Sequence, residues 1–372
     1  MRRSIPLPAP LAALPWIMLL PLFALVLFGA AVLYSAAGGS MSPYALSHIL
    51  RFLVFLVGAF VLMMLPRRLV IDNAYLAYGG VLLLLMAVEA VGAVGGGSQR
   101  WLELGVVRLQ PSELMKPVIV LVLASFFHTL PIGMLRSWRA LLPPLVLMGL
   151  PMGLVLLQPD LGTALAIGFG GVVVVFLAGV PLRWFIGGGL IAVVVAPLAY
   201  FFALQDYQRR RVTTFLDPES DPLGSGYHIT QSKIAIGSGG IDGKGFGQGS
   251  QSHLNYLPEP HTDFVFATMA EEWGLIGGLF VLLVFGIILR WGLLVARAAP
   301  DRFSRLLAAG MTATIFFYVA VNLMMVMGLA PVVGIPLPFM SHGGSSMMTN
   351  MICIGTLMMV DRWTRQAGGR TT

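Results

Sequence analysis

Charged residues are scarce in this chain of 372 residues. Only 10% of the residues are Asp, Glu, Lys or Arg, whereas soluble domains carry about 25%, and 57% are apolar. So few charges cannot cover the surface of a soluble protein of this size, which excludes a soluble enzyme with one large core. The net charge of +7 does not indicate nucleic-acid binding, because the basic residues are scattered along the chain.

Cysteine and the common catalytic motifs are also missing. Cys353 is the single cysteine, so an internal disulfide is excluded, and we interpret it as a small packed apolar residue. No spacing of His, Cys, Asp and Glu fits a zinc site. The glycines do not match the phosphate-binding G-x-x-x-x-G-K-[ST] pattern, and residue order alone implies no Ser-His-Asp arrangement.

Long apolar runs fill most of the sequence. A helix that crosses the hydrocarbon core needs about 20 apolar residues, and the first run is too long for a signal-peptide core. We therefore predict an all-α integral membrane protein, a single domain over residues 1–372, with a bundle of ten transmembrane helices. The predicted spans are 11–36, 45–65, 70–94, 112–128, 140–157, 163–180, 184–203, 264–289, 305–329 and 343–361.

The basic residues orient these spans. With both termini in the cytoplasm, 14 of the 23 basic residues fall at cytoplasmic ends, as the positive-inside rule requires. The other nine lie at a span start, in residues 95–116, or in the long polar segment 204–263. That segment is therefore predicted to face outward, together with residues 95–111, 158–163 and 329–342.

The outward segment 204–263 is polar, charged and rich in glycine, and it ends where an apolar run begins. A long loop among short ones is a frequent place for chemistry. Asp263 stands at this boundary beside His261 and Thr262, where its carboxylate would be placed to take a proton from a sugar hydroxyl. The alternative is that Asp263 caps the following helix.

Other polar residues lie at the predicted outer ends of spans, where they are costly unless paired or facing water. Glu113 and Lys116 are three residues apart, so they share a helix face and can pair. Asp160 is interpreted chiefly as a helix cap. Arg100 and Trp101 are interpreted chiefly as anchors at the membrane interface. Arg209–Arg211 could form a phosphate site or a solvated run of charges. Glu271 and Glu272 need partners at their position, and we expect structural pairing for them.

With these residues in view, the chain resembles the SEDS family (shape, elongation, division and sporulation), and within it the RodA branch. The resemblance covers most of the chain. It is carried by GSQRW at 97–101, QPSELMK at 110–116, QPDLGTA at 158–164, the block 206–240, LPEPHTDFVFA at 257–267 and PVVGIPLPFMSHGGSS at 331–346. His342 is a departure, because most relatives are expected to have tyrosine there.

The resemblance implies ten transmembrane helices and a peptidoglycan glycosyltransferase that polymerises lipid II at the outer face of the bacterial cytoplasmic membrane during cell elongation. It implies Asp263 as the catalytic residue and a class B penicillin-binding protein as the partner, among other elongation proteins. A divalent cation, Mg²⁺ or Mn²⁺, is expected to help, and no organic cofactor and no nucleic acid are expected. The candidate substrate-binding residues are Lys116, Glu113, Arg100, Trp101, Arg210, Gln231, Lys233, His261, Thr262 and Ser341.

Two other functions fit a polytopic membrane protein. A lipid II flippase or other transporter would place polar groups through the whole depth of the bundle, whereas here they concentrate at the outer ends. A non-catalytic scaffold of the wall-synthesis machinery would tolerate changes at Asp263. Polymer formation in detergent separates the enzyme from both.

Overall fold

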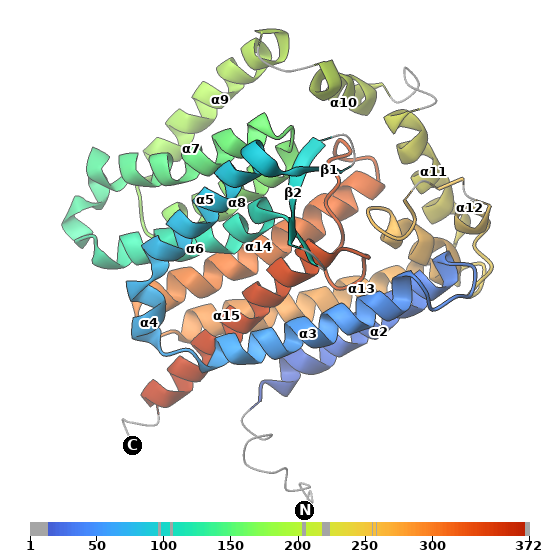
Figure 1. The fold of residues 1–372 in the computed structure, drawn as a ribbon, viewed down its shortest axis with the longest axis horizontal. Helices are drawn as coiled ribbons and strands as arrows, with labels where there is room; N and C mark the ends of the chain where they lie inside the picture. Colours follow the sequence, from blue (N-terminus) through green and yellow to red (C-terminus); the bar gives the residue numbers. More distant parts are fainter. Residues whose placement is uncertain are drawn as a thin grey trace, which may run out of the picture.

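The computed structural model describes residues 14–95, 98–104, 107–202, 206–217, 224–254, 256–257 and 259–368, and this part of the chain is almost entirely helical (Figure 1). The main helices are α2 (Trp16–Ala36), α3 (Tyr44–Met64), α4 (Arg67–Asp72), α5 (Ala74–Val91), α6 (Pro111–Thr129), α7 (Leu142–Leu157), α8 (Leu161–Leu177), α9 (Leu182–Phe202), α10 (Asp206–Leu216), α11 (Ser225–Ser238), α12 (Ser250–His253), α13 (Val265–Ala298), α14 (Arg302–Val326) and α15 (Gly344–Gly368).

Every predicted apolar run coincides with a helix, and the chain is a multi-pass all-α membrane protein. Within the described residues, seven helices are long and apolar enough to cross a membrane, and Ala74–Ala90 and Leu161–Leu177 are shorter apolar helices. The helix α15 is more polar because it carries buried Ser345, Thr349 and Asn350 toward the bundle interior. The total of ten spans stays a prediction.

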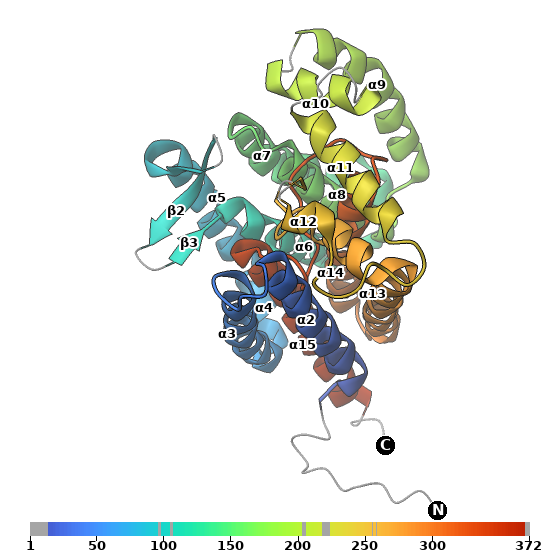
Figure 2. The same ribbon diagram turned by 90° about the vertical axis from the view of Figure 1, so that its right-hand side faces the viewer.

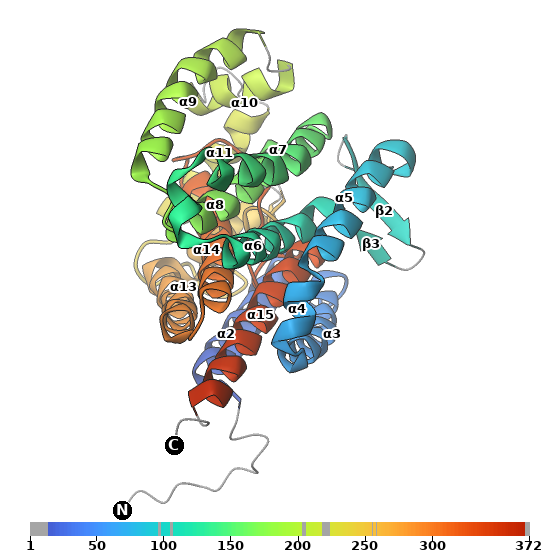
Figure 3. The same ribbon diagram turned by 90° about the vertical axis from the view of Figure 1, so that its left-hand side faces the viewer.

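The centre of the bundle is built by α6, α13, α14 and α15, while α3 and α7 are mostly covered on one side only. Close approach depends on small residues, as is usual between membrane helices. A Cβ atom at Gly310 of α14 would lie 2.5 Å from Val120 of α6, and one at Gly355 of α15 would lie 2.9 Å from the Ala59 backbone of α3. The helix α9 stands apart from this core (Figures 1 and 3), with none of its membrane window buried.

Residues 93–95, 98–104 and 107–109 form a small antiparallel sheet that the hydropathy pattern did not predict (Figure 2). Its strands are β1 (Ala93–Gly95), β2 (Ser98–Leu104) and β3 (Val107–Leu109), with Trp101 opposite Ala93 and Glu103 opposite Arg108. Strands of three and seven residues are too short to stand out beside helical runs of about 20 residues. The predicted span 70–94 is shorter in the structure. Asn73 separates α4 from α5, and α5 ends at Val91, just before β1.

Segment 204–263 was predicted as one long loop, but its described part contains the short helices α10, α11 and α12. The helix α11 packs against α13 and α14. Ser232 of α11 donates to the carbonyl of Val326 at 2.7 Å, so a buried hydroxyl fixes α11 to the C-terminal end of α14. The polar segment is therefore a layer of short helices on the bundle.

The helix α13 is broken at Gly274, whose φ of 59° and ψ of −155° are not helical. At the break, backbone carbonyl and amide groups of α13 form hydrogen bonds with the loop after α11. The amides of Lys244 and Gly245 donate to the carbonyls of Glu271 and Glu272, and the amides of Leu275 and Ile276 donate to the carbonyls of Gly240 and Ile241. The contact is so close that a Cβ at Gly243 would lie 2.1 Å from the carbonyl oxygen of Glu272.

The break turns residues 265–273 into a short helix that is held by the loop and begins beside Asp263. Buried carbonyl and amide groups must find partners, and here residues 240–245 supply them. This interlock fixes the start of α13 and hence the position of Asp263.

Candidate active site

Asp263 lies in the turn that leads into α13 and is partly buried. It is not the cap of that helix, because the N-cap is Phe264 and makes no side-chain capping bond. The side-chain amide of Asn322 on α14 donates through Nδ2 to the backbone carbonyl of Asp263 at 2.9 Å and to that of Ile335 at 2.8 Å. This fixes the backbone at Asp263 and the loop 327–343, which joins α14 to α15, to the same point of α14.

The carboxylate of Asp263 lies beside Gly334 of the loop 327–343. A Cβ atom built at Gly334 would lie 3.5 Å from Oδ2 of Asp263, and Gly334 has a φ of 69°, which favours glycine. Next to this point lies an apolar groove of about 440 Å³ between α8, α14 and residues 330–335. It is lined by Met152, Gly162, Leu165, Gly168, Phe169, Val172, Phe317, Val321, Ala330, Pro331, Val333 and Ile335. Asp263 therefore lies against the same loop segment, residues 330–335, that forms one wall of an apolar groove.

His261 and Thr262 belong to the same turn and are held from two sides. The Thr262 hydroxyl donates to Glu259 at 3.1 Å, and the ring of His261 stacks on Tyr44 of α3 with centroids 4.0 Å apart. Burial lowers the pKa of His261, and the carboxylate of Glu259 partly offsets this. At neutral pH the ring is therefore an uncharged neighbour of Asp263.

His342 connects this turn to α3. Its backbone amide donates to the carbonyl of His261 at 2.8 Å, and its ring Nε2 lies 3.2 Å from Nη1 of Arg51. Because Arg51 can only donate, Nε2 accepts and Nδ1 carries the proton toward Ser47, 3.5 Å away. Burial, followed by the charge of Arg51 and by His261, lowers the pKa of His342 to about 4.

Sequence reasoning placed neither Tyr44 nor Arg51 at the site. The available signal was charge, since Arg51 is one of the nine basic residues away from the predicted cytoplasmic ends. Its guanidinium lies against Gly344 at the start of α15, where a Cβ would be 3.7 Å away.

Glu113 and Lys116 form the predicted pair, with Lys116 Nζ 2.5 Å from Glu113 Oε1, and both are almost fully buried. Tyr318 of α14, which the sequence did not indicate, receives a bond from Lys116 at 2.7 Å and donates to the other oxygen of Glu113. Tyr318 and Asn322 are four residues apart and share one face of α14. That face therefore joins the buried ion pair to the backbone of Asp263.

Arg100 is bound to the protein rather than left free. It donates to the carbonyls of Gln158 and Pro159, and its Nη1 lies 3.8 Å from Asp160. Asp160 caps α8 as predicted, accepting from the amide of Thr163 at 3.0 Å. Arg100 thus fixes the strand β2 to the start of α8, and Trp101 follows it in β2, partly exposed.

The remaining predicted residues differ in how far they are exposed and in which elements they contact. Lys233 on α11 is exposed, and its Nζ lies against Gly328, while Gln231 is partly buried. Ser341 is buried and its hydroxyl accepts from the amide of Leu337 at 2.8 Å, so it shapes the outer loop. Arg210 lies on α10, and its side chain is outside the described residues.

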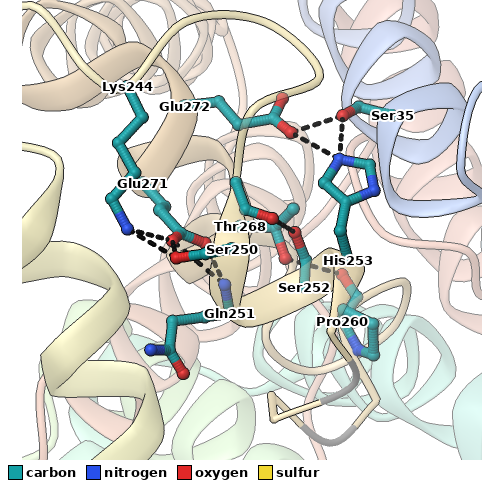
Figure 4. A network of polar contacts seen from close by, with 11 residues as sticks. Ser35, Lys244, Ser250, Gln251, Ser252, His253, Pro260, Thr268, Glu271 and Glu272 are labelled. Carbon is teal, nitrogen blue, oxygen red and sulfur yellow. Dashed lines mark hydrogen bonds and ion pairs between the residues drawn. The ribbon is translucent and has the colours of Figure 1, made fainter.

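Glu271 and Glu272 are fully buried and paired, as expected for structural residues (Figure 4). Glu271 accepts from Lys244 at 2.6 Å, from Ser250 and from the amide of Gln251. Glu272 accepts from Ser35 of α2 and lies 3.5 Å from His253. Both carboxylates thereby fasten residues 244–253 to the break in α13.

Across the residues that the structure describes, no group of three or more His, Cys, Asp or Glu is placed to hold a metal ion. The expected help from a divalent cation stays a prediction.

Comparisons with known proteins place this geometry in context. The family model described as "Cell cycle protein", for FtsW, RodA and SpoVE, matches residues 12–366. The chain is 44% identical over 355 residues to the peptidoglycan glycosyltransferase MrdB of Escherichia coli (strain K12), covering 92% of each chain. It is 39% identical over 287 residues to the stage V sporulation protein E of Bacillus subtilis (strain 168), covering 76% of this chain and 77% of the relative.

Solved structures agree with the sequence matches. A structure described as "Structural coordination of polymerization and crosslinking by a peptidoglycan synthase complex" has a TM-score of 0.80 at 35% identity, covering 94% of this chain and 98% of the other. The rod shape determining protein RodA of Thermus thermophilus has a TM-score of 0.71 at 33% identity, covering 93% and 96%.

Proposed function

Because the chain belongs to the FtsW, RodA and SpoVE family of cell cycle proteins, we propose that it is a peptidoglycan glycosyltransferase of cell elongation that polymerises lipid II. The observation that carries this proposal is that Asp263 lies against Gly334, in the loop segment 330–335 that forms one wall of the apolar groove. Lipid II joins a sugar to a long polyprenol through pyrophosphate, so its enzyme needs a base beside an apolar channel. This chain has both at one end of the bundle.

The reaction is a direct displacement. Asp263 takes the proton of the acceptor 4-hydroxyl as the oxygen attacks the anomeric carbon of the donor sugar. The bond from that carbon to the pyrophosphate oxygen breaks, the pyrophosphate leaves with its polyprenol, and the anomeric configuration inverts. A single base is enough for an inverting transfer without water, whereas glycosidases use two carboxylates.

The leaving pyrophosphate gains negative charge, and a nearby cation would stabilise it. Lys233 suits this role because its side chain is exposed on α11 and lies against Gly328, at the outer end of α14. Arg210, on the neighbouring α10, is the second candidate from the sequence. Lys116 is buried and bound to Glu113 and Tyr318, which supports a role in positioning α14.

The location and the partner follow from the same reaction. Lipid II is used at the outer face of the bacterial cytoplasmic membrane, so we place Asp263 outside and both termini in the cytoplasm, as the basic residues indicate. A class B penicillin-binding protein would crosslink the new strands. The similarity to a polymerase in a peptidoglycan synthase complex supports such a partner.

The direct test is to replace Asp263 by Asn and to measure polymer formation from lipid II in detergent. Loss of a general base lowers such a rate by roughly 10²–10⁴-fold, and we expect a loss in this range. The control is Glu89→Gln, which removes an exposed carboxylate on α5, outside the residues that hold α13, and should leave the rate unchanged. Equal rates in the wild type and Asp263→Asn would exclude Asp263 as the base.

A detergent assay also separates the enzyme from a transporter. A flippase needs a membrane to act across and makes no polymer in micelles. If the purified chain moves lipid II across vesicles but forms no glycan in detergent, the proposed function is wrong.

A further inference from the structure

A basic pocket lies at the end of the bundle opposite Asp263. The helix α3 has 21 residues, starts at Tyr44 beside His261 and ends at Met64, which places its two ends about 30 Å apart. Where α3 ends, a cavity of about 490 Å³ is lined by Met64, Arg67, Arg68, Arg362, Trp363 and Gln366, among others. This end also holds the end of α15 and the start of α2 (Figures 1 and 2).

The arginines of this pocket are only partly used by the protein. Arg67 pairs with Asp301 at 2.9 Å through Nη2, but its buried Nε has no hydrogen-bond partner. Arg362 donates to the carbonyl of Met63. Arg68 is exposed and makes none of the ion pairs found among the described residues. Three guanidinium groups, offset by one carboxylate, leave the pocket with a net positive charge.

A second cavity shares one lining residue with the first and lies among the membrane-spanning helices. It has a volume of about 380 Å³, is almost entirely apolar, and lies between α3, α5, α6, α14 and α15. Leu65 lines both cavities, and the second is completed by Leu62, Leu69, Leu121, Met311 and Met359, among others. The two cavities therefore adjoin at Leu65, and one is lined by basic side chains while the other is apolar.

We propose that these joined cavities bind one anionic glycerophospholipid of the inner leaflet, with its phosphate at Arg67, Arg68 and Arg362 and part of an acyl chain below Leu65. Guanidinium groups match phosphate oxygens in charge and in geometry. Trp363, whose indole donates to the carbonyl of Leu65 at 3.0 Å, stands where tryptophan commonly meets lipid headgroups. The lipid would hold together the ends of α3, α4 and α15.

The experiment uses the purified full chain in detergent, titrated with phosphatidylglycerol or phosphatidylethanolamine of identical acyl chains, with bound lipid counted by native mass spectrometry. We expect tighter binding of phosphatidylglycerol. A basic side chain near a membrane surface contributes about fivefold to binding anionic lipid, so the charge reversal Arg68→Glu should weaken that binding about 30-fold. Arg297→Glu, an exposed basic residue at the same end outside the pocket, is the control and should have little effect.

The apolar part has its own pair of variants. Ala77→Phe would fill the second cavity, which Ala77 lines, and should weaken both lipids equally. Ala90→Phe, at an exposed position of the same helix, should weaken neither. Bound lipid is counted only on protein that elutes as a single species, so a misfolded variant is recognised. If Arg68→Glu misfolds, Arg68→Gln takes its place.

Four outcomes would overturn the proposal. The two lipids bind the wild type equally, or Arg68→Glu behaves like Arg297→Glu. Soluble glycerol phosphate binds as tightly as phosphatidylglycerol, which would make this a site for free phosphate. A polyprenyl phosphate displaces phosphatidylglycerol through Arg68, which would make the occupant a wall precursor carrier.

Discussion

The ammonium of Lys116 and the carboxylate of Glu113 lie one helical turn apart on α6, almost fully buried, with Tyr318 completing the group. Their spacing of three residues was enough to predict the pair. The role of Tyr318 was not predictable, because it is 202 residues away and packing alone brings it there. The same holds for Arg51 and His342, which are 291 residues apart.

This group predicts a stability difference between single and double variants. Removing one partner of a buried ion pair leaves an uncompensated charge and costs roughly 3–5 kcal/mol. We expect Lys116→Met to be destabilised by about this amount, and Lys116→Met with Glu113→Gln to recover much of it. Thermal unfolding in detergent measures both. Equal melting temperatures for the two variants would mean that the charge of Glu113 is compensated elsewhere.

His342 predicts a pH dependence. Its pKa is about 4 in the folded chain because of burial, Arg51 and His261, against 6.5 ordinarily. Between these values the unfolded chain binds a proton that the folded chain does not, so stability is highest above pH 6.5 and falls as the pH drops toward 4. His342→Gln cannot take up that proton.

Unfolding midpoints measured from pH 7.5 to 4.5 test this prediction. The wild type should lose stability with acid more steeply than His342→Gln. The lowered pKa of His261 acts in the same direction and remains in the variant, so part of the slope persists. Identical slopes would show that the ring of His342 is not protected from protonation.

Among the elements, α13 differs most from what hydropathy predicts. The apolar run 264–289 was predicted as one span, yet the helix breaks at Gly274 and continues to Ala298. Apolar periodicity records which residues avoid water, and it carries no information on a single φ angle. The glycines of residues 239–249 were conspicuous in the sequence, but only the structure explains Gly239 and Gly243, where a Cβ would lie 2.0 Å and 2.1 Å from carbonyl oxygens of α13.

The break predicts the effect of one methyl group. A Cβ at Gly274 would lie 2.5 Å from the amide nitrogen of Gly243 and from the carbonyl oxygen of Ile241, at a φ that disfavours alanine. Gly274→Ala should therefore cost at least ~1–3 kcal/mol and reduce polymer formation, because the start of α13 carries Asp263. Melting temperature and the lipid II assay measure the two effects.

Gly286 supplies the control on the same helix. No atom lies within 4 Å of a Cβ built there, and alanine is a better helix former than glycine. Gly286→Ala should be as stable as the wild type or slightly more so. If Gly274→Ala matches it in stability and activity, the interlock with residues 240–245 does not position the site.

For the molecule as a whole, the sequence was sufficient for the all-α membrane architecture and insufficient for the small sheet and the broken helix. Orientation is the global property that remains open to experiment. Cys353 is buried and is the single cysteine of the chain, so introduced cysteines can be labelled without background. Asp242→Cys should react with a membrane-impermeant maleimide on intact spheroplasts, and Arg297→Cys should react only after lysis. The opposite pattern would place Asp263 in the cytoplasm.

The position of α9 has a consequence for how the bilayer acts on this protein. Its membrane window has no residue buried by the rest of the chain, so this helix is open to contact with lipid. Its end is tied to α10 by Arg209, which donates to the carbonyl of Phe201 at 2.9 Å, and by Tyr200 and Thr213, whose hydroxyls lie 3.1 Å apart. A helix solvated by lipid takes its tilt from bilayer thickness. A change in bilayer thickness is therefore expected to tilt α9 and to move α10 with it.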